Sequence, residues 1–185
     1  MKPCIVSVAA LLLMGCASTA QTPAVAQETP TTSSYLSDKT HSIDGRYFIG
    51  PQPTAADLAA LKQAGVTKVI SFRTPAEMEK LAFSQPGLLR ELGLGYDVIP
   101  VGGDAYGYTP AQMSALDEAL SDSDAGGKVL LHCGSGYRAS IIMVAWLVQE
   151  QGMSLDDAIT HAEGWWPLGL EKVLGRKLTV GFADE

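Results

Sequence analysis

The stretch KVLLHCGSGYRAS, residues 128–140, combines residue types that can bind and attack an anion. An apolar run leads into His132 and Cys133, and Arg138 begins a second apolar run. A thiolate is a strong nucleophile, and a guanidinium offers parallel N–H donors that match two oxygens of an anion. We therefore interpret Cys133 as a nucleophile and Arg138 as the positive charge that holds a small anionic or phosphorylated substrate.

Between these two residues lie Gly134, Ser135, Gly136 and Tyr137, which we predict to form the substrate-binding cradle. Glycine lets backbone N–H groups turn toward one bound anion, and the first turn of a helix adds positive partial charge. The same field favours the thiolate form of Cys133. The alternative is a small buried cysteine that ends a strand, followed by glycines that only turn the chain.

The elements that must position this loop alternate along the chain. The sequence predicts strands at residues 45–50, 66–72, 94–101 and 127–133, and helices at 53–65, 73–82, 109–122, 138–152 and 153–164. Helix starts are indicated by Thr54 with Asp57 three residues later, and by Thr74 with Pro75 and Glu77.

This alternation predicts a single α/β domain with a mostly parallel central sheet flanked by helices. The helix that begins at Arg138 is apolar all round, so we expect it to be central and buried. Ligands of such sheets bind beyond the carboxyl ends of the strands. Cys133 falls at such an end.

The first residues have the pattern of an export signal. Lys2 precedes an apolar run over residues 5–14, and Gly15 stands before Cys16. The segment LMGC resembles the bacterial lipobox, which implies cleavage before Cys16 and lipid attachment to it. We therefore expect a lipoprotein signal peptide at 1–15, a flexible tether at 16–40 and a catalytic domain at 41–185, with the protein exported, periplasm-facing and membrane-anchored. The alternative is an ordinary secretory signal with a chance cysteine.

Charge and cysteine content limit the function classes further. The chain has 13 Lys and Arg against 20 Asp and Glu, a formal net charge of −7, and no basic cluster. This excludes nucleic acid as an expected partner and argues against a large polyanionic substrate. With Cys16 lipidated and Cys4 removed, Cys133 is the only free thiol, so no intramolecular disulfide can form. The sequence does not indicate an oligomeric state.

Two stretches resemble known phosphatases. HCGSGYRAS resembles the phosphate-binding loop of cysteine-dependent tyrosine and dual-specificity phosphatases. Residues 47–77 resemble a bacterial phosphatase-like family named after its fusion to a beta-lactamase-like hydrolase, in which a Gln-Pro-Thr turn, a helix, a glycine and a strand ending in arginine recur. The match covers about residues 45–165. It implies a hydrolase that cleaves a phosphomonoester through a phosphocysteine, with no cofactor and no metal.

Residues outside the loop complete the candidate site. Dual-specificity phosphatases place a general acid on a loop after a strand, where this chain has Asp104; the alternative is a solvated turn residue. His132 is expected to orient the loop, Arg73 to support the pocket or lie exposed, and Ser140 to help the leaving thiolate. Ser140 stands one position later than the serine or threonine of phosphatases.

One departure leaves the reaction open. The phosphatase signature has five residues between cysteine and arginine, whereas this loop has four. That spacing also resembles the loop of rhodanese-type sulfurtransferases, which carry sulfur as a persulfide on cysteine. Two alternatives to a phosphatase therefore remain: a sulfurtransferase that uses a Cys133 persulfide, and a non-catalytic anion-binding lipoprotein.

Overall fold

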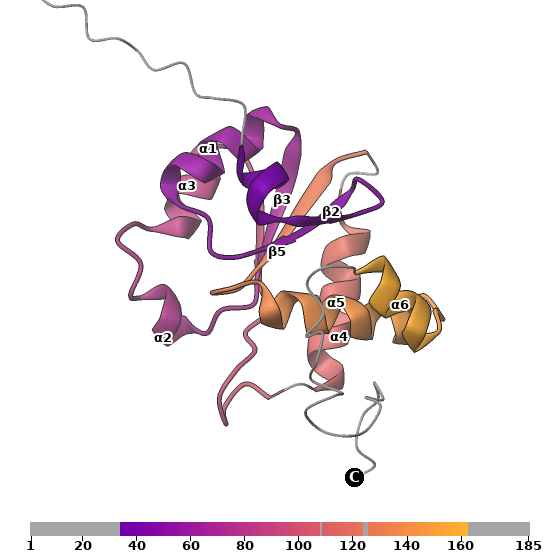
Figure 1. Ribbon diagram of the computed structural model, residues 1–185. Helices are drawn as coiled ribbons and strands as arrows, with labels where there is room; N and C mark the ends of the chain where they lie inside the picture. The colour runs from indigo at the N-terminus through magenta and orange to yellow at the C-terminus, as the bar shows by residue number, and fades with distance from the viewer. Residues whose placement is uncertain (1–33, 108, 124–125, 163–185) are drawn as a thin grey trace, which may run out of the picture.

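The computed structural model describes residues 34–107, 109–123 and 126–162 as one α/β domain (Figure 1). The predicted signal peptide with Cys16, most of the tether and the last part of the predicted catalytic domain lie outside these residues. The strands are β1 (His41–Ile43), β2 (Tyr47–Gly50), β3 (Val66–Ser71), β4 (Gly95–Val98) and β5 (Lys128–His132). The helices are α1 (Ala55–Gln63), α2 (Pro75–Met78), α3 (Gln85–Glu91), α4 (Pro110–Ser121), α5 (Tyr137–Gln149) and α6 (Leu155–His161), after a π-helical turn, η1 (Tyr35–Lys39).

The sheet has the order β1-β2-β5-β3-β4. Strand β5 lies in its centre and pairs in parallel with both β2 and β3, and β3 pairs in parallel with β4. Only β1 runs antiparallel, against β2. The predicted mostly parallel sheet is therefore confirmed. Because β5 is central, the loop that follows it emerges between the ends of β2 and β3.

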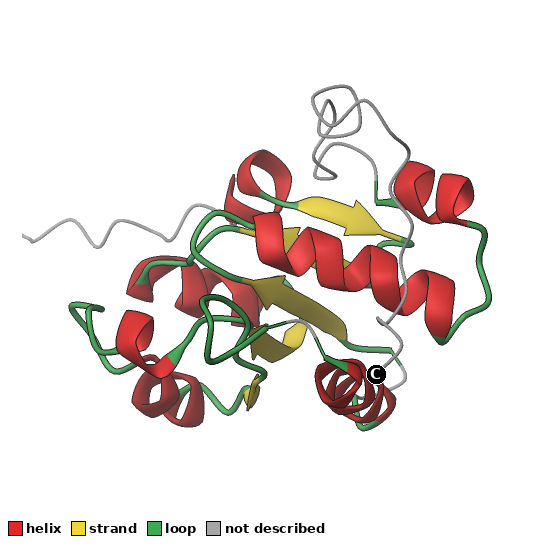
Figure 2. Ribbon diagram, turned by 90° about the horizontal axis from the view of Figure 1, so that it is seen from below, coloured by secondary structure: helices red, strands yellow, loops and turns green. Residues whose placement is uncertain are grey.

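Helices cover both faces of the sheet (Figures 1 and 2). Helices α4, α5 and α6 pack on one face around a cluster that includes Ile70, Leu131 and Ile142. Helices α1 and α3 and the turn η1 pack on the other face around a cluster that includes Leu61 and Leu130. The predicted burial of α5 is confirmed, because eight of its residues from Ala139 to Leu147 are buried. Burial of these apolar side chains supplies the main driving force for the fold.

Local capping signals set the helix starts as predicted. Thr54 and Asp57 form a capping box at α1, and Thr74 and Glu77 form another at α2. Helix α2 ends at Met78, earlier than predicted, and it buries no residue. Short helices gain most of their stability from tertiary packing, so nothing extends this one. Helix α3, which the sequence analysis did not predict, begins after Ser84 with a proline in its first turn.

The folded domain begins earlier than predicted. Residues 35–40 were assigned to the flexible tether, but Tyr35 is 1% exposed and packs in the cluster around Leu61. Its hydroxyl donates to the carbonyl of Pro51 at 2.5 Å, and burial raises its pKa. This buried aromatic side chain packs the turn η1 against the domain. Any truncated form should therefore keep residue 34 onward.

Within the part of the chain that the structure describes, no helix is long and apolar enough to cross a membrane.

Candidate active site

Cys133 directly follows β5 at the carboxyl end of the parallel strands and is 1% exposed. The backbone N–H of Gly136 donates to Cys133 Sγ at 3.1 Å. Gly136 caps α5 with φ +92°, a left-handed conformation that glycine adopts without strain. The loop thus turns one amide onto the sulfur, and the first amides of α5 that follow have no acceptor within the helix. This arrangement of backbone N–H groups at a helix start is one that can bind an anion.

Neighbouring strands hold the loop from outside. Gln52 N–H, beyond the end of β2, donates to the Gly134 carbonyl at 3.1 Å. Phe72 N–H, beyond the end of β3, donates to the His132 carbonyl at 2.9 Å. The cysteine loop therefore continues the pairing of the parallel sheet for one more residue on each side, which restricts its position.

Arg138 lies at the start of α5 with its guanidinium held on one edge. Its two terminal nitrogens donate to the Glu77 carboxylate, Nη1 to Oε2 at 2.9 Å and Nη2 to Oε1 at 2.6 Å. Nη1 also donates to the carbonyls of Phe72, at 3.2 Å, and Val101. These acceptors take up the N–H groups of Nη1 and one N–H of Nη2. The second N–H of Nη2 and the N–H of Nε remain as donors for a ligand.

The ion pair between Arg138 and Glu77 shifts both titrations. The hydrogen bonds from Arg138 lower the pKa of Glu77 to about 2, against desolvation that acts the other way. The same hydrogen bonds raise the pKa of Arg138. Thr74 also donates to Glu77, through its backbone N–H at 2.9 Å. Glu77 is therefore ionised at neutral pH and serves as an anchor for Arg138, not as a proton donor.

Gly102 lies against this arginine. A Cβ atom built on Gly102 would stand 2.9 Å from Arg138 Nη1, and the residue has φ +134°. Both the conformation and the close approach to Arg138 therefore favour glycine at this position.

His132, the last residue of β5, is fully buried next to Cys133. Its Nε2 lies 2.9 Å from Gln85 Nε2, and its Nδ1 lies 3.3 Å from the Cys133 carbonyl. Both contacts are hydrogen bonds when the ring is neutral with its proton on Nδ1. Burial lowers the pKa of His132 to about 4, which keeps that neutral form at pH 7. The geometry fits the expected orienting role.

Arg73 does not reach the loop directly. Its Nη1 donates to Gln52 Oε1 at 2.7 Å and its Nη2 donates to the Glu77 carbonyl at 3.0 Å, so it braces the segments that hold the loop. Ser140 is fully buried in the second turn of α5, and its hydroxyl has no hydrogen-bond partner. Its support of the leaving thiolate stays a prediction.

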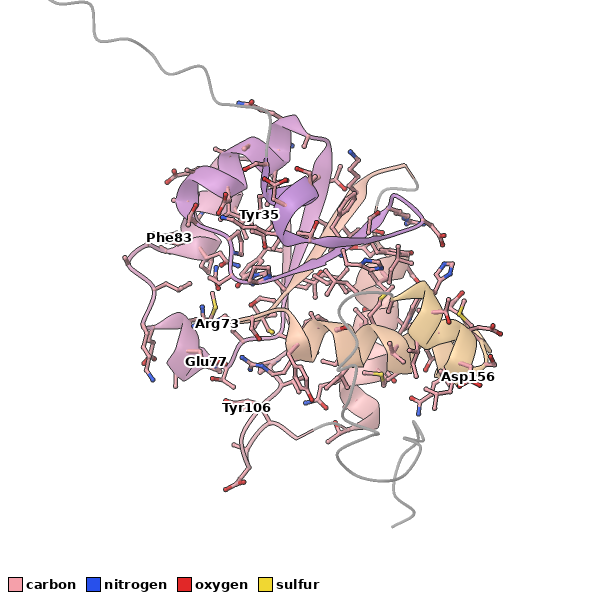
Figure 3. The ribbon with its side chains drawn as sticks, in the orientation of Figure 1. Tyr35, Arg73, Glu77, Phe83, Tyr106 and Asp156 are labelled. Carbon is pink, nitrogen blue, oxygen red and sulfur yellow. The ribbon has the colours of Figure 1, made fainter. Side chains whose placement is uncertain are left out.

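Asp104 lies in the turn after β4 and is exposed. The turn is closed by its own backbone, with Gly102 N–H donating to the Tyr106 carbonyl at 2.6 Å. In Figure 3 the labelled residues Arg73, Glu77 and Tyr106 lie on the same side of the molecule. The turn thus belongs to the region of the active loop, and the role of Asp104 as general acid stays a prediction.

Three residues that matter to this geometry were not predicted as site residues. Glu77 was recognised only as a helix cap, and Gln52 only as part of the Gln-Pro-Thr turn. Gln85 was not recognised at all, although it is fully buried. A buried glutamine must be hydrogen-bonded, but no local pattern names its partner. Among the described residues, no group of three or more His, Cys, Asp and Glu is arranged to hold a metal ion.

Comparison with known proteins gives the fold. No family model matches the chain, and no curated protein matches it. Solved structures, however, do match the chain. Tk-PTP in its active form is 23% identical, with a TM-score of 0.57 over 70% of this chain and 86% of its own. PTPMT1 in complex with PI(5)P is 22% identical, with a TM-score of 0.57 over 67% of this chain and 81% of its own.

A third structure, described as a candidate phosphatase (DUF442) from Shewanella putrefaciens CN-32, is 25% identical, with a TM-score of 0.52 over 65% of this chain and 78% of its own. The protein therefore has the fold of cysteine-dependent tyrosine and dual-specificity phosphatases. Its narrower resemblance to the hydrolase-fused bacterial family rests on the sequence motifs alone.

Proposed function

We propose that this protein is a cysteine-dependent phosphatase that hydrolyses a phosphomonoester through a phosphocysteine intermediate. One observation carries the proposal: Glu77 holds Arg138 beside a loop whose Gly136 N–H donates to Cys133 Sγ at 3.1 Å. Nucleophile, amide cradle and arginine are the parts that in-line attack on a phosphate group needs. The solved structures of the same fold named above are phosphatases by description, which supports the same reaction class.

In the proposed reaction Cys133 Sγ attacks phosphorus and the bond from phosphorus to the ester oxygen breaks. Arg138 and the loop amides stabilise the charge on the equatorial oxygens. Asp104 gives its proton to the leaving oxygen. Water then attacks the phosphocysteine and gives its proton to Asp104, which releases inorganic phosphate and restores the thiolate. Every group in this scheme comes from the chain itself.

The test compares two reactions of the full chain purified in detergent. p-Nitrophenyl phosphate reports phosphatase turnover, and thiosulfate with cyanide reports sulfur transfer through a persulfide. Each is repeated with Cys133→Ser. Phosphate release that disappears in Cys133→Ser is the expected result.

Two other outcomes would replace the proposal. Thiocyanate formation without phosphate release would assign the sulfurtransferase that the four-residue spacing allows. Binding of inorganic phosphate without turnover in either assay would assign a non-catalytic anion-binding module.

We also propose that the protein is an exported lipoprotein anchored through Cys16 and facing the periplasm. The supporting pattern is the apolar run that ends in LMGC. Mass spectrometry of the mature protein tests it. A mature N-terminus at Cys16 with added acyl mass is expected, and the same N-terminus without that mass would refute the anchor.

A further inference from the structure

Gln52 makes four hydrogen bonds, which link the loop after Cys133 to Pro53, Arg73 and Gln85. Its backbone N–H donates to the Gly134 carbonyl at 3.1 Å. Its side-chain oxygen accepts from Arg73 Nη1 at 2.7 Å. Its side-chain nitrogen donates to Gln85 Oε1 at 2.6 Å and to the Pro53 carbonyl at 3.0 Å. An amide side chain carries both a donor and an acceptor, so Gln52 can accept a hydrogen bond from Arg73 and donate one to Gln85 at the same time.

One arm leads from Gln52 to the nucleophile. Gln85 accepts from Gln52 Nε2, and its own Nε2 lies 2.9 Å from His132 Nε2. The neutral ring then donates from Nδ1 to the Cys133 carbonyl. Gln85 and His132 are both fully buried, so each contact is costly to leave unmade. The arm therefore holds the backbone of Cys133 through an uninterrupted series of donors and acceptors.

A second arm leads from Gln52 to the substrate-binding arginine. Arg73 bonds Gln52 with Nη1 and the Glu77 carbonyl with Nη2 at 3.0 Å. The Glu77 carboxylate in turn bonds both terminal nitrogens of Arg138. Arg73 thus links Gln52 to Glu77, the residue that holds Arg138.

We propose that Gln52 is a positioning residue that sets Cys133 and Arg138 at the separation needed to bind and attack one phosphate group. The inference deepens the proposed function and rests on it. The loop between the two residues has only four members, and one loop amide, that of Gly136, bonds the sulfur. The hydrogen bonds of Gln52 therefore set the distance between Cys133 and Arg138, which the short loop does not set by itself.

The test separates the two arms with two variants of the full chain. Gln52→Ala removes both arms. Gln52→Glu keeps an acceptor for Arg73 but has no donor for Gln85. If Gln85 flips its amide to pair with that carboxylate, it presents an oxygen to His132 Nε2. The ring proton then moves to Nε2, and the bond to the Cys133 carbonyl is lost.

Two measurements report on the two arms, one on the arm to Cys133 and one on the arm to Arg138. The rate of Cys133 alkylation by iodoacetamide at one fixed pH, measured on the peptide that contains Cys133, reports the position of the nucleophile. Protection of Cys133 from alkylation by inorganic phosphate reports the anion site and needs no turnover. Gln52→Glu should slow Cys133 alkylation, because the Cys133 backbone loses its hydrogen bond, and leave phosphate protection within about twofold of wild type, because the Arg73 arm remains. Gln52→Ala should change both, and lower kcat for p-nitrophenyl phosphate by roughly 10- to 100-fold, as expected for misplaced reacting groups.

The matched control is Asp117→Ala, which removes the acceptor of Trp146 Nε1 at 3.1 Å, a tertiary hydrogen bond with no link to the loop. It should lose thermal stability but keep both readouts. Gln85→Leu breaks the Cys133 arm without a change at Gln52 and should reproduce Gln52→Glu. The double variant Gln52→Glu with Gln85→Leu should be no worse than either one, since both cut the same arm.

Unchanged alkylation and unchanged phosphate protection in Gln52→Ala would overturn the inference, as would additive effects in the double variant. If Gln52→Ala does not fold, Gln52→Glu and Gln85→Leu decide the question by the same two readouts. A wild-type chain without phosphatase turnover would end the proposed function, while phosphate protection would still decide the role of Gln52.

Discussion

The loop that carries Cys133 and the turn that carries Asp104 are held very differently. The Cys133 loop is bonded by neighbouring strands on both sides and its arginine is fixed by Glu77. Asp104 is exposed in a turn closed mainly by its own backbone. The loop proposed to bind the anion is thus preformed, whereas Asp104, proposed as the proton donor, lies on a short turn. We expect variants of the loop to impair turnover of every substrate and variants of the turn to impair only that of substrates with poor leaving groups.

The largest effect is expected from Arg138→Lys. Lysine keeps the charge but cannot hold Glu77 and a phosphate with one planar fork, so kcat/KM for p-nitrophenyl phosphate should fall by about 10³-fold. Arg46→Lys, whose arginine donates to Ser123 Oγ at 3.0 Å, is the matched control and should retain activity. A loss of less than tenfold in Arg138→Lys would contradict a preformed arginine site.

The next largest effect is expected on the pH dependence of the free energy of unfolding. Burial lowers the pKa of His132 from 6.5 to about 4. Between these two pH values the histidine is protonated in the unfolded chain but neutral in the folded protein. The free energy of unfolding should therefore fall as pH falls through this window, by about 3 kcal/mol. The lowered pKa of Glu77 acts in the same direction at lower pH, between 4.5 and about 2.

Urea unfolding at pH 7 and pH 4 measures this. His132→Asn should remove that part of the pH dependence, because asparagine does not titrate. Gln63→Asn, which changes an exposed residue of α1 that does not titrate, is the control and should keep the wild-type pH dependence. An equal pH dependence in His132→Asn and wild type would show that His132 is not held neutral by burial.

Asp104→Asn should have a smaller effect that depends on the substrate. General acid catalysis matters most when the leaving oxygen is basic, so phenyl phosphate turnover should slow by roughly 10- to 100-fold. p-Nitrophenyl phosphate, with a better leaving group, should slow much less. Asp156→Asn on α6, far from this region in Figure 3, is the control. Equal slowing of both substrates would remove Asp104 from the mechanism.

Glu77→Gln tests the anchor of the arginine. The amide can still accept one hydrogen bond but loses the charge that orients Arg138, so kcat/KM should fall by about tenfold. Glu79→Gln changes the exposed residue that follows α2 and should have no effect. Wild-type activity in Glu77→Gln would mean that the two carbonyls of Phe72 and Val101 hold the arginine alone.

The smallest effect is expected from Gly102→Ala, measured as the affinity for inorganic phosphate. The new Cβ would displace Arg138 Nη1 and weaken binding by roughly threefold, as a small misplacement does. Gly103→Ala shares the strain of a positive φ, here +68°, but meets nothing within 4 Å. The two variants should therefore differ in phosphate affinity, and equal affinities would assign the effect to the backbone alone.

The sequence alone was sufficient for the framework of the domain. The capping boxes at Thr54 and Thr74, the strand that delivers Cys133 and the buried helix after it are all local patterns, and the structure has them where they were predicted. Local patterns work here because a cap, a glycine or an alternating strand acts on residues only a few positions away. The same reasoning erred at Tyr35, whose burial depends on α1 and Pro51, distant along the chain.

Only the tertiary structure determined which side chains of the site contact one another. Arg138 meets Glu77 across 61 residues, and Gln52 meets Gln85 across 33. Nothing in the residues around each partner identifies the other, because an ion pair or an amide contact is chosen by the packing of the sheet and its helices. The sequence determined that a cysteine and an arginine share one loop; the packing of β2, β3 and α2 around β5 decided how far that loop is preformed.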